Sequence, residues 1–287
     1  MKVYLNGNIV NKEDAKISVF DHGFLYGDGA FEGIRSYSRL VFKLKEHIDR
    51  LYETAHTLMM DVSLTKEQMS QAIVDTLKAN NLSDAYIRVV VTRGAGDLGL
   101  DPNKCKGNSS IVIITDKITL YADDLYKNGM EIITVPTVRN HPEALNPKLK
   151  SLNYLNNILA KIEANISGYS EAIMLDHSGY VAECTGDNIF IVKKGRLLTP
   201  AQGCLRGITR DTVIDLARQQ RIETEEGLIT RHEVYNADEC FLTGTAAEII
   251  PVVRVDGRPI SDGKPGEVTQ KMMKLFKAVT QKDGVKY

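Results

Sequence analysis

The sequence lacks the features that would connect it to a membrane or to nucleic acid. Its formal net charge is −1, and its 36 lysines and arginines are not gathered into a basic block. Proteins that bind nucleic acid or anionic membranes carry such a patch, so neither partner is expected. No apolar run is long enough to span a bilayer, and residues 1–16 are too polar for a signal peptide. These absences predict a cytoplasmic protein.

Motifs for metal chemistry and for common nucleophiles are also missing. The chain has only four cysteines, which are Cys105, Cys184, Cys204 and Cys240. None has CxxC spacing, which argues against a zinc site and against a disulfide framework. The six histidines show no HExxH-like spacing, and no G-x-S-x-G or Walker sequence occurs. We therefore expect no metal.

One apparent nucleotide motif is rejected. Gly94, Gly96 and Gly99 form a literal G-x-G-x-x-G after a strand-like run. A dinucleotide site also needs a helix that begins on these glycines, so that its N-terminus faces the pyrophosphate. Pro102 and further turn residues follow instead. The segment is predicted to be a hairpin or an active-site loop.

What the sequence does contain is typical of a folded α+β protein. Hydrophobic residues make up 43% and charged residues 25%, which argues against disorder. Helices are predicted in residues 46–60, 65–81, 146–161, 209–220 and 265–281, and strands in 2–10, 85–94, 109–118, 130–139, 169–200 and 237–257. Because the strands cluster, two sheet-based domains are favoured over a doubly wound parallel sheet. With the polar break 120–129 as a linker, the domains would be 1–119 and 130–287.

The segment "NPKLKSLNYLNNILAK" places two lysines before an apolar helical pattern. The apolar residues that recur at helical spacing are Leu152, Leu155, Leu159 and Ile162. Such a stripe predicts a helix that packs into a core. An ammonium beside it must stay solvated or find a partner. Either Lys148 and Lys150 are solvated loop residues, or one of them is a buried amine kept for chemistry.

Two segments could bind an anion through backbone N–H groups. In "LRGITRDTVIDLA", Gly207 precedes Ile208 and Thr209 at the expected first turn of a helix. Free N–H groups and the helix dipole make such a turn an anion site. "LTGTAAEIIP" has a second turn of small residues, at Gly244. The alternatives are that Thr209 only caps its helix and that the second turn only connects two strands.

A carboxylate completes the set. In "YVAECTGDNIFIV", Glu183 lies near a strand end, on the same face as Val181. An inward carboxylate needs a cationic partner, for which a protonated ring nitrogen would serve, whereas a surface strand end is the plain alternative. An amine, two anion cradles and this carboxylate together match the needs of pyridoxal phosphate.

At this point the sequence resembles a fold type IV pyridoxal-phosphate enzyme, and most closely a branched-chain amino acid aminotransferase. The matching blocks, in order, are "DHGFLYGDGAFEGIRSY", "HIDRL", "AYIR", "KSLNYLNNILA", "EAIMLDHSGYVAECTGDNIF", "GITRD" and "GTAAEI". The resemblance implies an α+β fold of two sheet-based α/β domains with the cofactor at their interface. It also implies transamination between Leu, Ile or Val and 2-oxoglutarate.

The resemblance implies a role for each matching residue. Lys150 would be the Schiff-base lysine and Lys148 would be solvated. Tyr154, four residues further on, would lie one helical turn from Lys150 if the helix has begun there. The implied cofactor-binding residues are Arg50, Lys150, Tyr154, Glu183, Gly207, Ile208, Thr209, Gly244 and Thr245. The implied substrate-binding residues are Tyr26, Phe31, Tyr86, Arg88, Tyr121, Thr245 and Ala246.

In this family Tyr26 and the "DLGLD" loop are supplied across a dimer interface, which implies a homodimer or a higher homo-oligomer. Three alternatives stay open. "KSLNY" is one residue shorter than the segment of many branched-chain enzymes, and it also resembles D-amino acid transaminases and aminodeoxychorismate lyases. Cys184 likewise stands where glycine is frequent. From another class, a non-catalytic scaffold protein would need none of Lys150, Glu183 and Arg50.

Overall fold

A computed structural model of the protein describes residues 1–118 and 121–287. The chain divides into two compact units. The first unit comprises Met1–Ile118, Leu149–Asn153 and Thr280–Tyr287, and the second comprises Thr119–Lys148 and Tyr154–Val279. The predicted boundary at residues 119 and 120 lies outside the described residues, and the domain limits stay a prediction.

The first unit is built on an antiparallel sheet. Its strand order is β16-β4-β3-β5-β6-β1-β2. The strands are β1 (Lys2–Leu5), β2 (Asn8–Asn11), β3 (Gly29–Tyr37), β4 (Leu40–Phe42), β5 (Ala85–Thr92), β6 (Ser110–Asp116) and β16 (Gly284–Lys286). Its helices are α1 (His22–Tyr26), α2 (Leu44–Thr57) and α3 (Lys66–Ala79), with 3-10 turns at η1 (Lys12–Asp14) and η2 (Pro102–Lys104).

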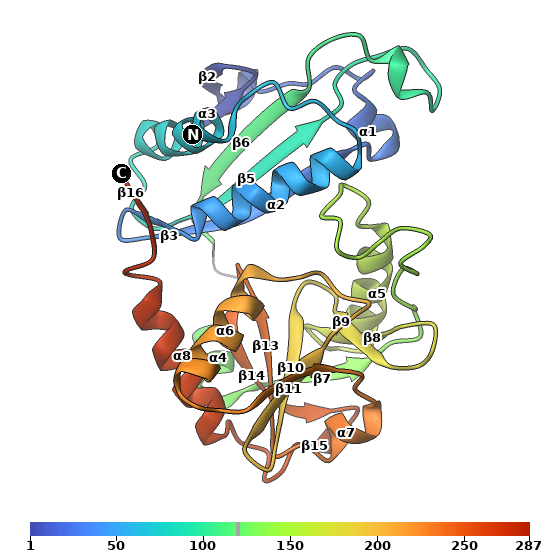
Figure 1. The fold of residues 1–287 in the computed structure, drawn as a ribbon, viewed down its shortest axis with the longest axis vertical. Helices are drawn as coiled ribbons and strands as arrows, with labels where there is room; N and C mark the ends of the chain where they lie inside the picture. The colour runs from blue at the N-terminus through green and yellow to red at the C-terminus, as the bar shows by residue number, and fades with distance from the viewer. Residues whose placement is uncertain (119–120) are drawn as a thin grey trace. The chain divides into compact units, whose positions relative to one another are not determined.

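Helices α2 and α3 pack on this sheet through their apolar residues (Figure 1). Ile48 and Leu51 of α2 join Ile73 and Leu77 of α3 in one core with the sheet residues. Residue Thr65 caps α3, and its side chain and that of Gln68 form the expected capping box. The helices predicted in 46–60 and 65–81 and the strands in 2–10, 85–94 and 109–118 are therefore confirmed.

The rejected glycine motif is a loop, as predicted. Gly94 and Gly99 have positive φ angles of 96° and 119°, which disfavour any residue with a side chain. The chain then enters η2 and no α-helix begins on the glycines. No helix N-terminus is available there to face a pyrophosphate.

The second unit contains a mixed sheet. Its strand order is β12-β11-β10-β13-β14-β7-β8-β9, and β15 pairs with β14. The strands are β7 (Met130–Thr134), β8 (Ala172–Leu175), β9 (Val181–Cys184), β10 (Asn188–Lys193), β11 (Arg196–Pro200), β12 (Thr224–Gly227), β13 (Glu239–Gly244), β14 (Glu248–Val255) and β15 (Arg258–Pro259). The helices are α4 (Asp123–Asn128), α5 (Leu155–Ile166), α6 (Ile208–Gln219), α7 (Arg231–Tyr235) and α8 (Glu267–Val279).

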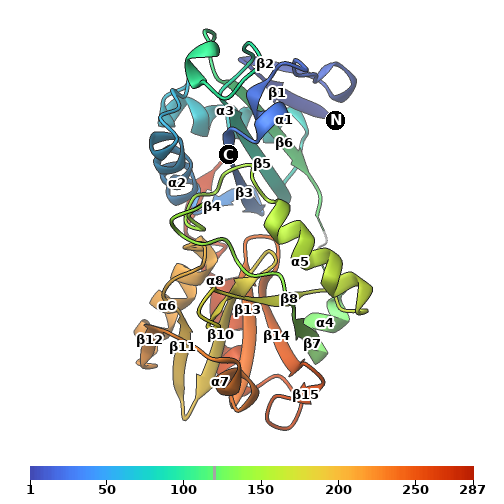
Figure 2. The same ribbon diagram turned by 90° about the vertical axis from the view of Figure 1, so that its right-hand side faces the viewer.

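The clustering of strands carried the fold prediction, which is confirmed as α+β. In the second unit β11–β12, β14–β7 and β7–β8 are parallel pairs, while the others are antiparallel. Figure 2 shows α6 beside this sheet and α5 beside β8. The segment expected to be a linker, residues 120–129, contains α4, whose Leu125 and Tyr126 pack on the core of the second unit. The predicted helices in 209–220 and 265–281 correspond to α6 and α8.

The prediction that the apolar stripe of residues 152–162 packs into a core is wrong. Helix α5 begins only at Leu155, so Leu152 lies outside it. The exposed fractions are 66% for Leu155, 47% for Leu159 and 46% for Ile162. The helix packs instead through Ala160 and Ala164, which join the residues of β8. Helical spacing identifies a continuous face, but close approach to this sheet selects the face with small side chains.

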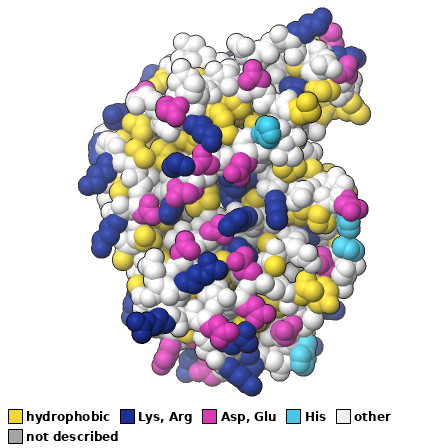
Figure 3. Space-filling model, viewed as in Figure 1, with side chains coloured by type: hydrophobic (Ala, Val, Ile, Leu, Met, Phe, Trp, Pro, Cys, Tyr) yellow, Lys and Arg dark blue, Asp and Glu magenta, His cyan; other side chains and the backbone are white. Residues whose placement is uncertain are grey.

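The described residues include no helix that is long and apolar enough to cross a membrane. Within 1–118 and 121–287, no group of three or more His, Cys, Asp or Glu side chains is arranged to hold a metal ion. On the face drawn in Figure 3, acidic and basic side chains are interspersed. A cytoplasmic location stays a prediction.

Candidate active site

Lys150 lies in the first unit beside strand β3. Its carbonyl oxygen accepts a hydrogen bond from the N–H of Phe31 (3.0 Å), and its own N–H donates to Thr54 Oγ1 (3.4 Å). The Nζ atom is 4.4 Å from the centre of the Phe31 ring. Lys148, by contrast, is exposed and belongs to the second unit. The fold thus separates the two lysines and holds the half-buried Lys150 amine against an aromatic ring.

The helical-turn argument for Tyr154 is wrong. Tyr154 is the N-cap residue of α5, and the helix begins only after it. Lys150 lies four residues before this cap, outside the helix, so Lys150 and Tyr154 are not successive positions on a helical face. The role of Tyr154 therefore rests on the resemblance alone.

Arg50 is held by a buried carboxylate that the sequence reasoning missed. The Nε and one terminal nitrogen of Arg50 donate to the two oxygens of Glu32, at 2.7 and 2.8 Å. His47 Nδ1 lies 2.8 Å from Glu32 Oε2, and Glu32 and His47 are both buried. This bidentate pairing fixes the plane of the guanidinium group. Residues 47 and 50 are neighbours on one face of α2, which was the available signal.

The charges of this cluster follow from its contacts. Burial alone would raise the pKa of Glu32, but the Arg50 charge and the hydrogen bond from His47 lower it to about 2. Burial lowers the pKa of His47, and the charges of Arg50 and Lys150 act in the same direction. Glu32 is therefore ionised and His47 neutral near pH 7, so His47 Nδ1 carries the proton and donates it to Glu32.

Glu32 gives a testable pH dependence. Because its pKa is lower in the folded protein than the ordinary value of 4.5, its contribution to stability is complete above pH 4.5 and is lost as the pH falls toward 2. Glu32→Gln should lower the free energy of unfolding by about 3 kcal/mol at pH 7, since it leaves Arg50 without its counter-charge. Urea unfolding of both proteins from pH 7 to pH 2.5 measures the difference, which should shrink below pH 4.5. A difference that is constant with pH would contradict this account.

The predicted substrate residues of the first unit gather on neighbouring strands. Tyr86 and Arg88 alternate along β5 with buried residues, so they lie on one face of the strand, as expected. The Arg88 guanidinium carbon is 4.5 Å from the Phe31 ring centre and 5.4 Å from that of Tyr86. Tyr26 ends α1, and its hydroxyl accepts a hydrogen bond from the N–H of Gly99 (2.9 Å). The cation and the aromatic walls thus come together, and the "DLGLD" loop is tied to Tyr26 within one chain.

In the second unit, Glu183 is an inward carboxylate, which excludes the surface alternative. It is buried in β9, and its Oε1 accepts a hydrogen bond from Arg139 Nε (2.7 Å). Its Oε2 accepts one from the N–H of Leu205 (2.9 Å). The pair with the buried Arg139 keeps the carboxylate charged in this environment. Arg139 was missed by the sequence reasoning, although it follows a predicted strand.

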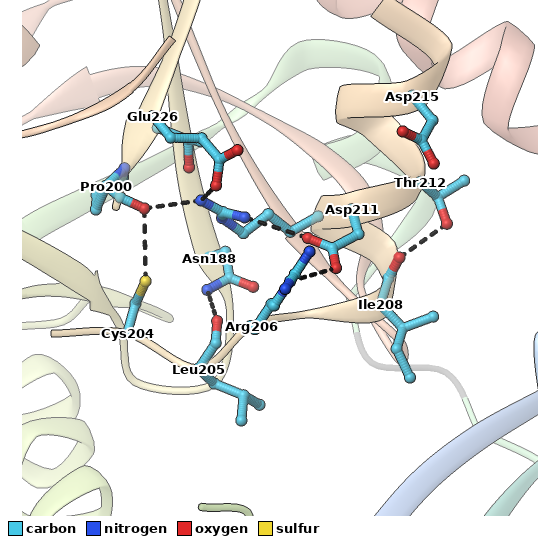
Figure 4. Close-up of polar contacts among 12 residues, drawn as sticks. Asn188, Pro200, Cys204, Leu205, Arg206, Ile208, Asp211, Thr212, Asp215 and Glu226 are labelled. Carbon is cyan, nitrogen blue, oxygen red and sulfur yellow. Dashed lines mark hydrogen bonds and ion pairs between the residues drawn. The ribbon is translucent and has the colours of Figure 1, made fainter. Parts of the chain in front are cut away.

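The first predicted anion cradle is the N-terminus of α6. Gly207 is the N-cap residue, with no side-chain cap, and Ile208 and Thr209 begin the helix. Thr209 is thus inside the first turn, and the alternative that it caps the helix is wrong. The turn is anchored by Arg210, which donates to Pro200 O (2.9 Å) and to Glu226 Oε2 (2.8 Å) (Figure 4). Uncapped N–H groups on a rigid helix form a site for an anion.

The second cradle is the turn between β13 and β14. Gly244 pairs with Glu248, so Thr245 and Ala246 lie in the turn itself. This turn is a tight strand connection, as the plain alternative expected, and it leaves Thr245 and Ala246 only half-buried. Tyr121, just beyond the undescribed residues, has its hydroxyl 3.4 Å from Asp187 Oδ2.

Comparisons with known proteins identify the family. The model of the class IV amino-transferases matches residues 29–255. A protein of Methanocaldococcus jannaschii, named only provisionally as a branched-chain-amino-acid aminotransferase, is 55% identical over 100% of this chain and 99% of its own length. The branched-chain amino acid aminotransferase of Escherichia coli has a similar structure, with a TM-score of 0.94, 35% identity, and coverage of 100% of this chain and 97% of that one.

The branched-chain amino acid aminotransferase of the organism abbreviated T.th. is also similar. Its structure with pyridoxamine 5'-phosphate has a TM-score of 0.93 and 36% identity, and it covers 98% of this chain and 94% of that one. Further structures of that enzyme, each with a TM-score of 0.91 and 36% identity, hold N-(5'-phosphopyridoxyl)-L-glutamate or 4-methylvaleric acid. They cover 98% and 97% of this chain, respectively, and 94% of that enzyme. The first compound carries a dicarboxylic amino acid and the second a branched aliphatic chain.

Both the sequence relatives and the structural neighbours match over almost the full length of the chain. The protein is an enzyme that belongs to the class IV aminotransferases, with the branched-chain-amino-acid aminotransferases as its relatives.

Proposed function

We propose that the protein transfers the amino group of branched-chain L-amino acids to 2-oxoglutarate with pyridoxal phosphate as its cofactor. The observation that carries the proposal lies within the second unit. The buried carboxylate of Glu183 and the segment leading to the uncapped N-terminus of α6 meet at Leu205, whose N–H binds Glu183. A pyridinium nitrogen needs such a carboxylate and a phosphate needs such a helix terminus.

The residues present fit this cofactor. A side chain at Gly207 would place its Cβ 2.1 Å from Asn188, and one at Gly244 would place its Cβ 2.0 Å from Asp187, so both turns require glycine. Their backbones thereby stay open to a ligand. The residues proposed to bind the phosphate are Arg50, Gly207, Ile208, Thr209, Gly244 and Thr245. Glu183 would face the pyridine nitrogen and Tyr154 the phenolic oxygen.

When bound, the cofactor supplies the electron sink for the reaction. The proposed work of the chain is to hold this group and to move a proton. Lys150 Nζ is the base that removes the proton from the substrate Cα and returns it to the C4′ atom of the cofactor. A neutral lysine is required for this step, and burial together with nearby cationic groups lowers a lysine pKa in general.

The substrate side of the proposal rests on the first unit. Phe31, Tyr26 and Tyr121 would wall an apolar pocket for the aliphatic side chain, while Tyr86 and the Thr245–Ala246 backbone would bind the α-carboxylate. Arg88, held at 4.5 Å from Phe31, would pair with the distal carboxylate of glutamate or 2-oxoglutarate. This arrangement would allow one site to accept both substrates in turn.

A homodimer is proposed as the smallest complete unit. The "DLGLD" loop exposes Leu98 and Leu100, and α1 exposes Phe24. Exposed apolar side chains of this size on one unit are typical of a surface that a partner covers.

The proposal is tested with the purified protein loaded with pyridoxal phosphate. Adding L-leucine without an acceptor should convert the visible absorbance of the cofactor into that of the pyridoxamine form, and 2-oxoglutarate should reverse the change. D-alanine should leave the spectrum unchanged. Conversion by D-alanine alone would move the enzyme to the D-amino acid transaminases. Release of pyruvate from aminodeoxychorismate, without any 2-oxo acid acceptor, would indicate the lyase.

A further inference from the structure

Two neighbouring residues of the second unit lie behind the two anion cradles and have no role in the proposed function. Asp187 and Asn188 lead from β9 into β10, and both are buried. Asn188 pairs with Thr243 in the sheet, so Asp187 lies beside Gly244. The question is what two buried polar side chains contribute at this position.

Asn188 joins the carboxylate Glu183 to the segment before α6. Its Nδ2 donates to the carbonyl oxygen of Leu205 (2.8 Å) and lies 3.4 Å from Glu183 Oε2. The N–H of Leu205 donates to the same Glu183 oxygen (2.9 Å). The three residues thus form a closed ring of hydrogen bonds, and Figure 4 shows Asn188 directed at Leu205. Asn188 Oδ1 also packs against Gly207, the N-cap of α6.

Asp187 has the corresponding position behind the second cradle. Its Oδ1 packs against Gly244, so closely that a Cβ at Gly244 would lie 2.0 Å away. Its Oδ2 lies 3.4 Å from the hydroxyl of Tyr121. Its carbonyl oxygen accepts a hydrogen bond from the N–H of Cys184 (2.8 Å), which closes the turn that carries Glu183.

The surroundings of Asp187 favour its neutral form. Burial and the buried carboxylate of Glu171 raise the pKa of Asp187 to about 7. The other titratable groups that face it are Tyr121, Lys161, Cys184 and Glu183. A neutral carboxyl group can be replaced by an amide of the same shape, which gives the test a conservative variant.

We propose that Asp187 and Asn188 are positioning residues, with Asn188 setting the cradle at the N-terminus of α6 and Asp187 setting the cradle at Gly244. This inference rests on the proposed function, because it assigns the first cradle to the cofactor phosphate and the second mainly to the substrate carboxylate. Neither residue touches the ligand; each acts through the glycine backbone that it contacts.

The test separates two affinities. Asn188→Ala should weaken binding of pyridoxal phosphate to the apoenzyme by about 10- to 100-fold, as is usual when a partner behind a ligand is removed. At saturating cofactor its KM for L-leucine should change less than about threefold. Asp187→Ala should show the opposite pattern, with a KM for L-leucine raised about 10-fold or more. Asp187→Asn should keep the KM near that of the wild type.

Thr269→Val is the matched control, because Thr269 is buried and its hydroxyl donates to Glu239 at the opposite end of β13 from Gly244. It should lower the melting temperature without changing either affinity. If Asn188→Ala does not fold, Asn188→Ser replaces it, since its shorter side chain cannot span the same contacts.

Three results would overturn the inference. The first is that both alanine variants lose stability as the control does, with cofactor affinity and KM unchanged. The second is that Asp187→Asn is as impaired as Asp187→Ala. The third is a wild-type protein that binds no pyridoxal phosphate, which would remove the proposed function as well. Wild-type binding together with unaffected variants would remove only the inference.

Discussion

Lys150→Ala is expected to lower the turnover number for L-leucine by more than about 10⁴-fold, whereas Lys148→Ala should be nearly silent. The difference follows from where the fold puts the two amines. Lys150 is half-buried with its Nζ 4.4 Å from the Phe31 ring, and Lys148 is exposed. Loss of an amine that bonds the cofactor and also moves the proton removes two contributions, of which proton transfer alone is worth about 10²- to 10⁴-fold.

The measurement is single-turnover conversion of L-leucine by each variant loaded with pyridoxal phosphate. Melting temperatures provide the control for folding, because neither side chain is part of a core. If both variants lost activity equally, the amine would be misassigned. An unaffected Lys150→Ala enzyme would exclude Lys150 as the base.

Glu183→Gln should have the second largest effect, and it should act on stability and on activity at once. The change leaves the buried guanidinium of Arg139 without a counter-charge, which costs about 3–5 kcal/mol of folding free energy. It also removes the charge proposed to keep the pyridine nitrogen protonated, so turnover should fall by about 10²-fold or more, as for other preorganised electrostatic groups.

A double variant separates the two effects. In Glu183→Gln/Arg139→Met neither member of the pair carries a charge, so most of the lost stability should return. Activity should not return, because the electron sink still lacks its carboxylate. Urea unfolding and turnover are measured for the wild type, the single variant and the double variant. Recovery of both quantities would show that Glu183 is structural only, and recovery of neither would show that the Arg139 charge is not the source of the instability.

The boundaries of several elements were predictable because their signals are local. The capping box of Thr65 and Gln68 requires only two side chains and the first turn of α3. Gly207 before Ile208 and Thr209 likewise marked the start of α6. Helix α4 inside the expected linker was not predicted, since its six residues Asp123–Asn128 give no apolar periodicity of useful length.

The partners of the site residues could not be predicted. Glu32 and Arg50 are separated by 18 positions, and Arg139 and Glu183 by 44. No pattern within one segment specifies such a pair, because it depends on which strand or helix packs beside which. The same holds for Asp187 and Asn188, which meet Gly244 and Gly207 only in the folded sheet.

The sequence by itself determined the chemical inventory: the amine, the carboxylate, the two glycine turns and the α+β class. These follow from residue type and local spacing, which the chain carries before it folds. Only the tertiary structure decided that Lys150 and not Lys148 is held against Phe31, and that α5 buries its alanines and exposes its leucines. It also decided which cation pairs with each buried carboxylate. Burial and charge pairing arise between distant segments, so their effects exist only once those segments are packed together.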